Sequence, residues 1–154
     1  MSIVYFSLGS NLGDREKNLN DAVMSLSMEV GSIICQSGLF ASKPVGFESE
    51  NDFLNIVLSM QTNLPPIELL AKIQEIEINL GRVSKSINVY SDRMIDIDIL
   101  LYDNLMIELP MLKIPHPLMT VRDFVMITLA EIAPDLVHPT IGKTISQLAD
   151  ELNS

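Results

Sequence analysis

The sequence predicts an α+β fold: an antiparallel sheet with helices on one face, plus helices at the C-terminal end. Two observations predict it. Segments with strand-like composition and segments with apolar residues at helical spacing follow one another in the order β-α-β-β-α-β. Apolar residues make up 47% of the chain, which is enough for a core. The length of 154 residues suits one domain, so we expect a single domain over residues 1–154.

The first part of the chain carries clear signals for a strand and a helix. Residues 3–11, IVYFSLGSN, are rich in β-branched and aromatic residues and end in turn residues, which predicts a strand. Asp14 is a good N-cap, and apolar residues at helical spacing extend to Val30, so the predicted helix ends at Gly31. The next predicted segments are a second strand (32–42), a loop (43–51) and a third strand (52–62).

The second part begins with a helix that starts near Pro66, a residue suited to the first helical position, and ends at Gly81. Its predicted buried stripe consists of Ile67, Leu70, Ile73, Ile76 and Leu80. Residues 82–93 are polar and irregular, and a strand follows over residues 95–102. The last predicted elements are a short strand within a proline-bounded segment (106–117) and two helices (118–132 and 144–152).

This order of elements is the signature of a ferredoxin-like sheet, which is the fold we expect. The net charge of −10 argues against a nucleic-acid partner, because phosphate binding needs a basic face. No apolar run reaches about 18 residues and no signal-peptide pattern opens the chain, so we expect a soluble, cytoplasmic protein without a membrane partner. Cys35 is the only cysteine, which excludes an intrachain disulfide.

Residues 93–102, RMIDIDILLY, place two carboxylates in an otherwise apolar strand. Side chains two residues apart in a strand point to the same face, so Asp96 and Asp98 share one face, while the isoleucines beside them share the other. Two carboxylates this close repel each other unless a cation lies beside them. The candidates are Mg²⁺, which prefers oxygen ligands, and the nearby Arg93 and Lys85. Ordinary surface acids on an exposed strand are the alternative.

Half of the ten basic residues gather in the segment 82–122, around these aspartates. They are Arg82, Lys85, Arg93, Lys113 and Arg122. In an acidic chain, such a cluster favours the binding of a small polyanion such as a phosphate compound. Solvated surface charges are the alternative. His116, held between two prolines in KIPHP, is a further candidate phosphate contact, with a purely structural histidine as the alternative.

Six motifs occur in an order that is typical of one family. They are SLGSNLGD, FLNIV, IEINLGRV, RMIDIDILL, IPHP and RDFVMITLAEIAPDLVHP. The family's central pattern, R-x-x-D-[LIV]-D followed by two aliphatic residues, is present from Arg93 to Leu100. Over essentially its full length, the chain therefore resembles the 6-hydroxymethyl-7,8-dihydropterin pyrophosphokinases of the folate pathway.

The resemblance implies that pyrophosphate is transferred from ATP to the hydroxymethyl group of the pterin, with release of AMP. It implies two Mg²⁺ ions as cofactors, ATP as co-substrate and small-molecule partners only, and we expect a monomer. Asp96 and Asp98 match the family's metal-binding aspartates, and Arg82 and Arg93 match its phosphate-contacting arginines. These four residues are the expected catalytic residues.

The resemblance also implies two sets of binding residues. The expected ATP contacts are Gln74, Glu77, Arg82, Lys85, Tyr90, Arg93, Ile99, Lys113, His116 and Arg122. The expected pterin contacts are Ser42, Pro44, Val45, Phe53, Asn55, Asp96 and Phe124. Asn55 matches the residue that hydrogen-bonds the ring, and Phe53 and Phe124 match the aromatics that sandwich it, although by themselves these two phenylalanines read as core residues.

Two other functions are open at this point. The first is a non-catalytic ferredoxin-like module that binds a small molecule, which would need neither the aspartate pair nor a metal. The second is another metal-dependent nucleotide transferase that uses the D-x-D pair. It would release a different leaving group and would not need an aromatic sandwich for a pterin.

Overall fold

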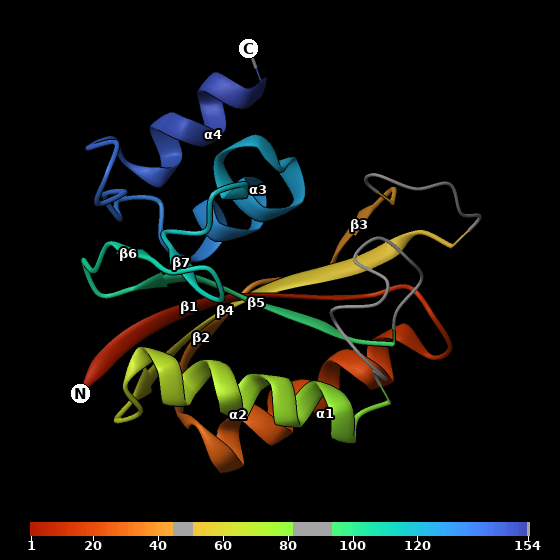
Figure 1. The fold of residues 1–154 in the computed structure, drawn as a ribbon. Coiled ribbons are helices and arrows are strands. Elements are labelled where there is room, and N and C mark those ends of the chain that lie inside the picture. Colours follow the sequence, from red (N-terminus) through yellow and green to blue (C-terminus); the bar gives the residue numbers. More distant parts are fainter. Residues whose placement is uncertain (45–50, 82–93, 154) are drawn as a thin grey trace.

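The computed structural model describes residues 1–44, 51–81 and 94–153 of the chain. One sheet lies between two layers of helices: α1 and α2 cover one face, and α3 and α4 lie on the other (Figure 1). In chain order, the elements are β1 (Ser2–Ser10), α1 (Arg15–Glu29), β2 (Gly31–Gln36), β3 (Phe40–Ser42), β4 (Phe53–Thr62), α2 (Pro66–Asn79), β5 (Asp96–Tyr102), β6 (Ile107–Glu108), β7 (Lys113–Ile114), the 3-10 turn η1 (Met119–Val121), α3 (Asp123–Ile132) and α4 (Ile145–Asn153).

The main sheet has the strand order β2-β4-β1-β5, and all neighbouring strands in it are antiparallel. Each central strand connects through a helix to an edge strand, β1 through α1 to β2 and β4 through α2 to β5. β3 pairs with the beginning of β4, and β6 and β7 form a separate two-stranded sheet. The predicted α+β fold, a ferredoxin-like sheet with additional C-terminal helices, is confirmed.

The helices on the first face begin where the sequence predicts. The side chain of Asp14 accepts the backbone N–H three residues further on at 3.1 Å, and Pro66 is the first residue of α2. The predicted stripe of α2 is wrong at one position, because Ile67 is 50% exposed. The helix instead turns Leu69 and Ile73 into the core, so its buried face starts two residues later than predicted.

The predicted strand over residues 32–42 is wrong as a single strand, since it divides into β2 and β3 at Ser37. Ser37 is still bonded to β4: its N–H donates to the carbonyl of Val57 at 2.9 Å, and its hydroxyl accepts the N–H of Val57 at 2.8 Å. The next amide, that of Gly38, donates instead to the carboxylate of Glu131 on α3, at 3.1 Å to Oε1. The contact with Glu131 draws the chain away from β4 after Ser37, and β3 then pairs with β4 separately.

The predicted helix over residues 118–132 is also wrong as a single element. It consists of a 3-10 turn and α3, because the backbone of Arg122 between them is extended, with φ −106° and ψ 110°. The short strand predicted in residues 106–117 is present as a hairpin of two short strands, β6 and β7. None of the helices in the described part of the chain is long and apolar enough to cross a membrane.

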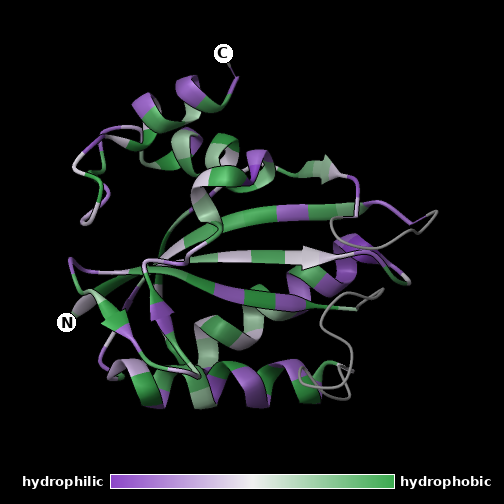
Figure 2. Cartoon of the chain, turned by 45° about the horizontal axis from the view of Figure 1, so that its top comes forward, coloured by the Kyte–Doolittle hydropathy of each residue, from purple (hydrophilic) through white to green (hydrophobic). Residues whose placement is uncertain are grey.

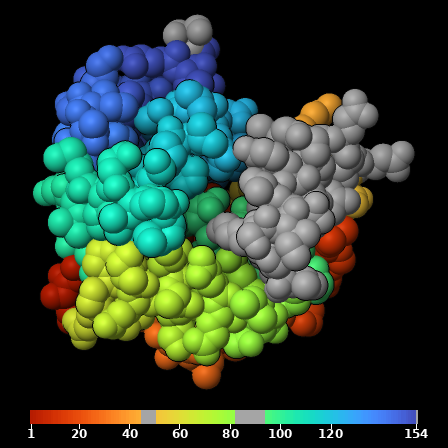
Figure 3. All heavy atoms as spheres, in the orientation of Figure 1, coloured from red at the N-terminus to blue at the C-terminus, as the bar shows by residue number. Residues whose placement is uncertain are grey.

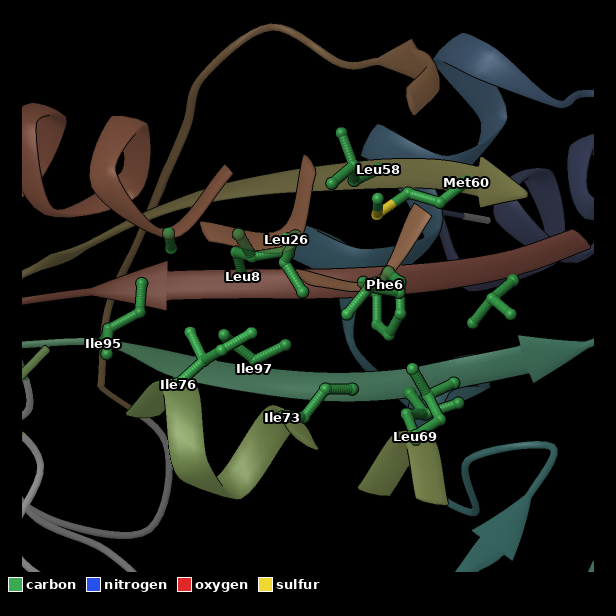
Figure 4. Packing of buried hydrophobic residues seen from close by; sticks show 14 of the residues in the cluster. Phe6, Leu8, Leu26, Leu58, Met60, Leu69, Ile73, Ile76, Ile95 and Ile97 are labelled. Carbon is green, nitrogen blue, oxygen red and sulfur yellow. The ribbon is translucent and has the colours of Figure 1, made fainter. Parts of the chain in front are cut away.

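The main core lies between the sheet and the pair α1 and α2 (Figure 4). The strands β1, β4 and β5 contribute alternate residues to it, such as Phe6 and Leu8 from β1 and Leu58 from β4. The three isoleucines that alternate with the aspartates on β5, Ile95, Ile97 and Ile99, all belong to this cluster. The prediction that isoleucines and aspartates face opposite sides of the sheet is therefore confirmed.

A second apolar cluster lies on the opposite face, under α3 and α4. The sheet contributes Val57, Leu100 and Leu101 to it. Leu100 and Leu101 are consecutive residues, yet both belong to this cluster, because the β1–β5 register skips Leu100 at a bulge. Figure 2 shows that hydrophilic residues interrupt the otherwise hydrophobic strands of the sheet.

Candidate functional site

Three strands bring the candidate residues together on the sheet face opposite α1 and α2. Asn55 on β4 lies opposite Gly9 on β1, and Gly9 lies opposite Asp96 on β5. The next row of the same face consists of Val57, Ser7 and Asp98. Since neighbouring strands lie roughly 4.8 Å apart, the backbone positions of Asn55 and Asp96 are separated by only about 10 Å. The fold thus places the predicted pterin-binding amide and the predicted metal-binding carboxylates side by side.

The carboxamide of Asn55 is held in one orientation. The side chain is 3% exposed, and its Nδ2 donates to the carbonyl of Phe40 at 2.9 Å and to the Ser42 hydroxyl at 2.8 Å. Both acceptors lie on β3, so this short strand fixes the amide. With both N–H groups used, the side chain presents its oxygen as an acceptor for an N–H of a ligand.

Gly9 brings no side chain to the surroundings of this amide. A Cβ atom at position 9 would lie 3.1 Å from Asn55 Oδ1 and 3.3 Å from Cδ1 of Phe53, which is closer than such atoms normally approach. The amide oxygen and the Phe53 ring therefore lie close against the backbone of Gly9, which is itself buried.

The second predicted aromatic, Phe124, lies on α3 and packs against the cluster under α3 and α4. The guanidinium carbon of Arg122 lies 5.8 Å from the centre of its ring, within cation–π range. Both phenylalanines are half-buried, which suits side chains that are shared between the core and a ligand. The aromatic sandwich itself stays a prediction.

The aspartates are half-buried on β5. Asp98 Oδ2 lies 3.9 Å from Nη1 of Arg122, a long ion pair whose side chains are both 21% exposed. At this distance the guanidinium faces the carboxylate but does not form a short hydrogen bond with it. A phosphate group of a ligand could also contact this arginine, which lies at the edge of the same sheet face.

Glu77 has a role that the sequence did not indicate. Its side chain is 2% exposed, and Oε2 accepts the backbone N–H of Ile97 at 2.8 Å. This bond joins α2 to β5 at the residue between the two aspartates, so Glu77 positions the strand that carries them. Its expected contact with ATP stays a prediction.

A hollow of about 230 Å³ opens beside Asp98, between α2, β5 and the segment around β7. Figure 3 shows it as a recess with β5 at its floor. Four of the expected ATP residues line it, namely Gln74, Ile99, Lys113 and His116. The fold therefore gathers these residues next to an aspartate at the edge of the sheet that β5 forms.

The bulge in β5 helps to place His116. The carbonyl of Leu100 accepts the backbone N–H of His116 at 2.9 Å, and Nδ1 of the ring accepts the N–H of Leu118 at 3.1 Å. In a neutral ring the proton then lies on Nε2, which makes this nitrogen a hydrogen-bond donor. A donor at the edge of the hollow suits an anionic ligand.

Five expected residues lie outside the described part of the chain: Val45, Arg82, Lys85, Tyr90 and Arg93. Pro44 is described and follows β3 directly. Sequence reasoning missed Gly9 and Ser7, whose residue types give no chemical signal by themselves. Their position opposite Asn55 and the aspartates is visible only once the strand register is known.

The donor set fits Mg²⁺. Among residues 1–44, 51–81 and 94–153, no group of three or more histidine, cysteine or acidic side chains could hold a metal ion. Asp96 and Asp98 offer a pair of hard oxygen ligands instead. Mg²⁺ in nucleotide sites is commonly held by one or two carboxylates together with substrate phosphates, so a pair is sufficient.

Comparison with known proteins shows which family the chain resembles. A family model, 7,8-dihydro-6-hydroxymethylpterin-pyrophosphokinase (HPPK), matches residues 5–134. The 2-amino-4-hydroxy-6-hydroxymethyldihydropteridine pyrophosphokinase of Porphyromonas gingivalis is 47% identical over 141 residues, which cover 90% of this chain and 95% of the relative. The enzyme of the same name from Aquifex aeolicus is 41% identical over 153 residues, covering 98% of this chain and 92% of the relative.

The fold is also found among solved structures. The crystal structure of wild-type Plasmodium falciparum HPPK-DHPS with pteroate superposes with a TM-score of 0.78 at 16% identity, covering 97% of this chain and 44% of that chain. At this identity the likeness concerns the fold alone. The match to the family model and the two bacterial relatives go further: this chain belongs to the 7,8-dihydro-6-hydroxymethylpterin-pyrophosphokinase family.

Proposed function

We propose that the sheet face carrying Asn55, Gly9, Asp96 and Asp98 is the site where this chain carries out its family's reaction. The reaction is the transfer of pyrophosphate from ATP to 6-hydroxymethyl-7,8-dihydropterin in folate biosynthesis. The observation that carries the proposal is the β4–β1–β5 register. It sets an amide acceptor suited to a heterocycle in the same row as a carboxylate suited to Mg²⁺.

On the pterin side, the ring lies over Gly9. Its N–H groups donate to Asn55 Oδ1, which faces this space because β3 holds the amide nitrogen. Phe53 borders the same space, and Phe124 on α3 supplies the second aromatic surface. This arrangement points the hydroxymethyl group towards β5 and its aspartates.

On the β5 side, Asp96 and Asp98 hold two Mg²⁺ ions. When bound, these ions neutralise charge on the phosphates and favour loss of the acceptor's proton. Glu77 keeps the strand in place through the N–H of Ile97, so that both carboxylates stay on one face. The aspartates can also accept the hydroxyl proton late in the reaction.

The chemical step joins the hydroxymethyl oxygen to the β-phosphorus of ATP. The bond from that phosphorus to the oxygen bridging the α- and β-phosphates breaks, AMP leaves with the bridging oxygen, and the hydroxyl proton is lost. Such a step needs positioning and charge stabilisation more than covalent help from the protein. We assign positive charge or hydrogen bonds to the phosphates from Lys113, His116 and Arg122, which lie near Asp98. The resemblance to the family assigns the same role to Arg82 and Arg93.

The proposal includes the remaining expectations from the sequence. The whole chain acts as one domain and as a monomer in the cytoplasm, with ATP and the pterin as its only partners. The single-domain part is supported by the match of the family model to residues 5–134, which spans both helical layers.

The test is the release of AMP from ATP, followed by chromatography, with and without 6-hydroxymethyl-7,8-dihydropterin over a range of Mg²⁺ concentrations. We expect AMP only when both pterin and Mg²⁺ are present. Folded protein that releases no AMP but still binds the pterin would contradict the proposal and support a non-catalytic binding module. Release of a different product from ATP would point to another nucleotide transferase.

A further inference from the structure

Ser7 is a buried hydroxyl that the fold does not use. The residue lies in the middle of β1 and is 7% exposed. Among the buried polar side chains in the described ranges, each of the others makes a hydrogen bond with a described residue, whereas the hydroxyl of Ser7 makes none. Leaving a buried hydroxyl without a hydrogen bond costs free energy, so such a group calls for an explanation.

The strand register shows what surrounds Ser7. On one side its neighbour is Val57, which is apolar, and on the other side it lies directly opposite Asp98. Side chains in directly opposite positions of an antiparallel pair have Cβ atoms about 4.5–5.5 Å apart, so a serine hydroxyl reaches the facing carboxylate by rotation about one bond. Asp98 is thus the cross-strand acceptor available to Ser7.

We propose that Ser7 is a positioning residue for the metal site: its hydroxyl donates to the Asp98 carboxylate when Mg²⁺ and the nucleotide are bound. A carboxylate that binds a metal through one oxygen is oriented by a hydrogen bond to the other. Ser7 faces Asp98 directly across the strand pair and is near enough to provide such a bond. Ser7 supplies it without adding charge.

The position of Ser7 indicates that its hydroxyl supports metal binding and not pterin binding. In the proposed function the pterin lies over Gly9 in the neighbouring row, where β1 carries no side chain. Ser7 belongs to the row of Asp98 instead, between the pterin space and the cluster under α3 and α4. This inference rests on the proposed function, because it needs the aspartates to hold Mg²⁺.

The test is a binding measurement on the whole chain with α,β-methylene-ATP, an analogue that cannot transfer its pyrophosphate. Calorimetry gives the Mg²⁺ concentration that half-saturates nucleotide binding in the wild type and in Ser7→Ala. We expect this concentration to rise about tenfold in Ser7→Ala, the lower end of what loss of a bond to a metal ligand does to metal affinity. The dissociation constant of the pterin alone should not change.

Ser59→Ala is the matched control. Ser59 is a 4% exposed serine on β4, on the same sheet face but opposite Tyr5, away from the aspartates. Its hydroxyl makes a long hydrogen bond of 3.5 Å to the carbonyl of Cys35, so its loss removes a buried hydroxyl without touching the site. We expect Ser59→Ala to show the wild-type Mg²⁺ dependence.

An unchanged Mg²⁺ dependence in Ser7→Ala would overturn the inference. So would a weaker affinity for the pterin with an unchanged Mg²⁺ dependence, because that result would place the hydroxyl against the pterin. If the wild type itself bound the analogue equally well with Mg²⁺ and with a chelator, the proposed function would fail, and the inference with it. The wild-type measurement therefore separates the two failures.

Discussion

The two faces of this sheet differ in how far helices cover them. Towards α1 and α2, the strands present a continuous apolar surface that is packed along its length. On the other face, α3 and α4 pack over Val57, Leu100 and Leu101, and the neighbouring positions are polar or small. Those positions are Ser7, Gly9, Asn55, Asp96 and Asp98. The same strands therefore build a core on one side and divide the other side between a core and a site.

The two-residue alternation of side chains along a strand decides which face of the sheet a side chain lies on. Whether that face becomes core depends on whether helices pack over it. Asp98 and Ile97 are neighbours in the chain, yet Ile97 is 1% exposed in the core under α2, whereas the side chain of Asp98 is 21% exposed. Substitutions on the first face should therefore reduce stability, and substitutions at the polar end of the second face should reduce activity.

The largest effect is expected for Phe6→Ala on the face that α1 and α2 cover. Phe6 is fully buried among the strands and α2, so its truncation leaves a cavity. We expect the free energy of unfolding to drop by about 3–5 kcal/mol, as measured by urea denaturation. A loss below about 1 kcal/mol would mean that this face is not packed as described.

Asp98→Ala tests the other face. Removal of a metal-binding carboxylate should reduce turnover by more than about 100-fold, because charge stabilisation at the transferred phosphates is lost. The free energy of unfolding should stay within about 1 kcal/mol of the wild type, since the side chain lies outside both apolar clusters.

Asp21→Ala is the control for this substitution, because Asp21 is an exposed acid on α1 whose ion pair with Lys17 lies on the surface. It should leave turnover unchanged. A folded Asp98→Ala protein with near-normal turnover would remove Asp98 from the metal site.

Gly9→Ala probes the pterin half of the same face. The new methyl group would press on the oxygen of Asn55, which cannot move freely because β3 holds its nitrogen. We expect KM for the pterin to rise about tenfold, equivalent to ~1.4 kcal/mol, with little change in KM for ATP. Steady-state kinetics with each substrate varied in turn gives both values.

Gly38→Ala provides the comparison for that effect. A Cβ atom there would meet its nearest neighbour, Glu131 Oε1, at an ordinary contact distance of 3.5 Å. Its kinetics should match those of the wild type. Equal changes in KM for the pterin in both variants would mean that Gly9 has no special place beside the ring.

The smallest effect concerns pH and stability near α4. Burial lowers the pKa of His138 from its usual 6.5, and its neutral Nδ1 accepts the N–H groups of Thr140 and Ile141 at 3.3 and 3.2 Å. The folded state thus prefers the neutral ring. This stabilisation is fully present above pH 6.5 and is lost as the pH drops through the lowered pKa.

Urea denaturation of the wild type and His138→Gln at several pH values measures this effect. We expect the advantage of the wild type, about 1 kcal/mol at neutral pH, to shrink as the pH decreases below 6.5. An advantage that grows on acidification would contradict the burial of a neutral ring.

The sequence alone predicted most of the fold, because strands and helices here follow their periodicities. It predicted that Asp96 and Asp98 share a face and that the isoleucines alternating with them lie on the other face, and the packing confirms both predictions. It did not predict the break at Ser37, because that break depends on a contact with Glu131, which is distant in sequence.

The site was less predictable than the fold. Glycine and serine carry no signal of their own, so Gly9 and Ser7 became candidates only through the register that sets them between Asn55 and the aspartates. Glu77 reads as an ordinary helix acid, although its carboxylate supports β5 from a buried position. Such roles arise from pairing and packing between segments, which the local sequence pattern does not contain.

The decisive experiment is a crystal structure of the chain with Mg²⁺, α,β-methylene-ATP and 6-hydroxymethyl-7,8-dihydropterin. We expect the pterin to lie over Gly9 with an N–H donated to Asn55 Oδ1, and both Asp96 and Asp98 to coordinate metal ions. A pterin bound elsewhere, or metal ions held without these carboxylates, would contradict this expectation.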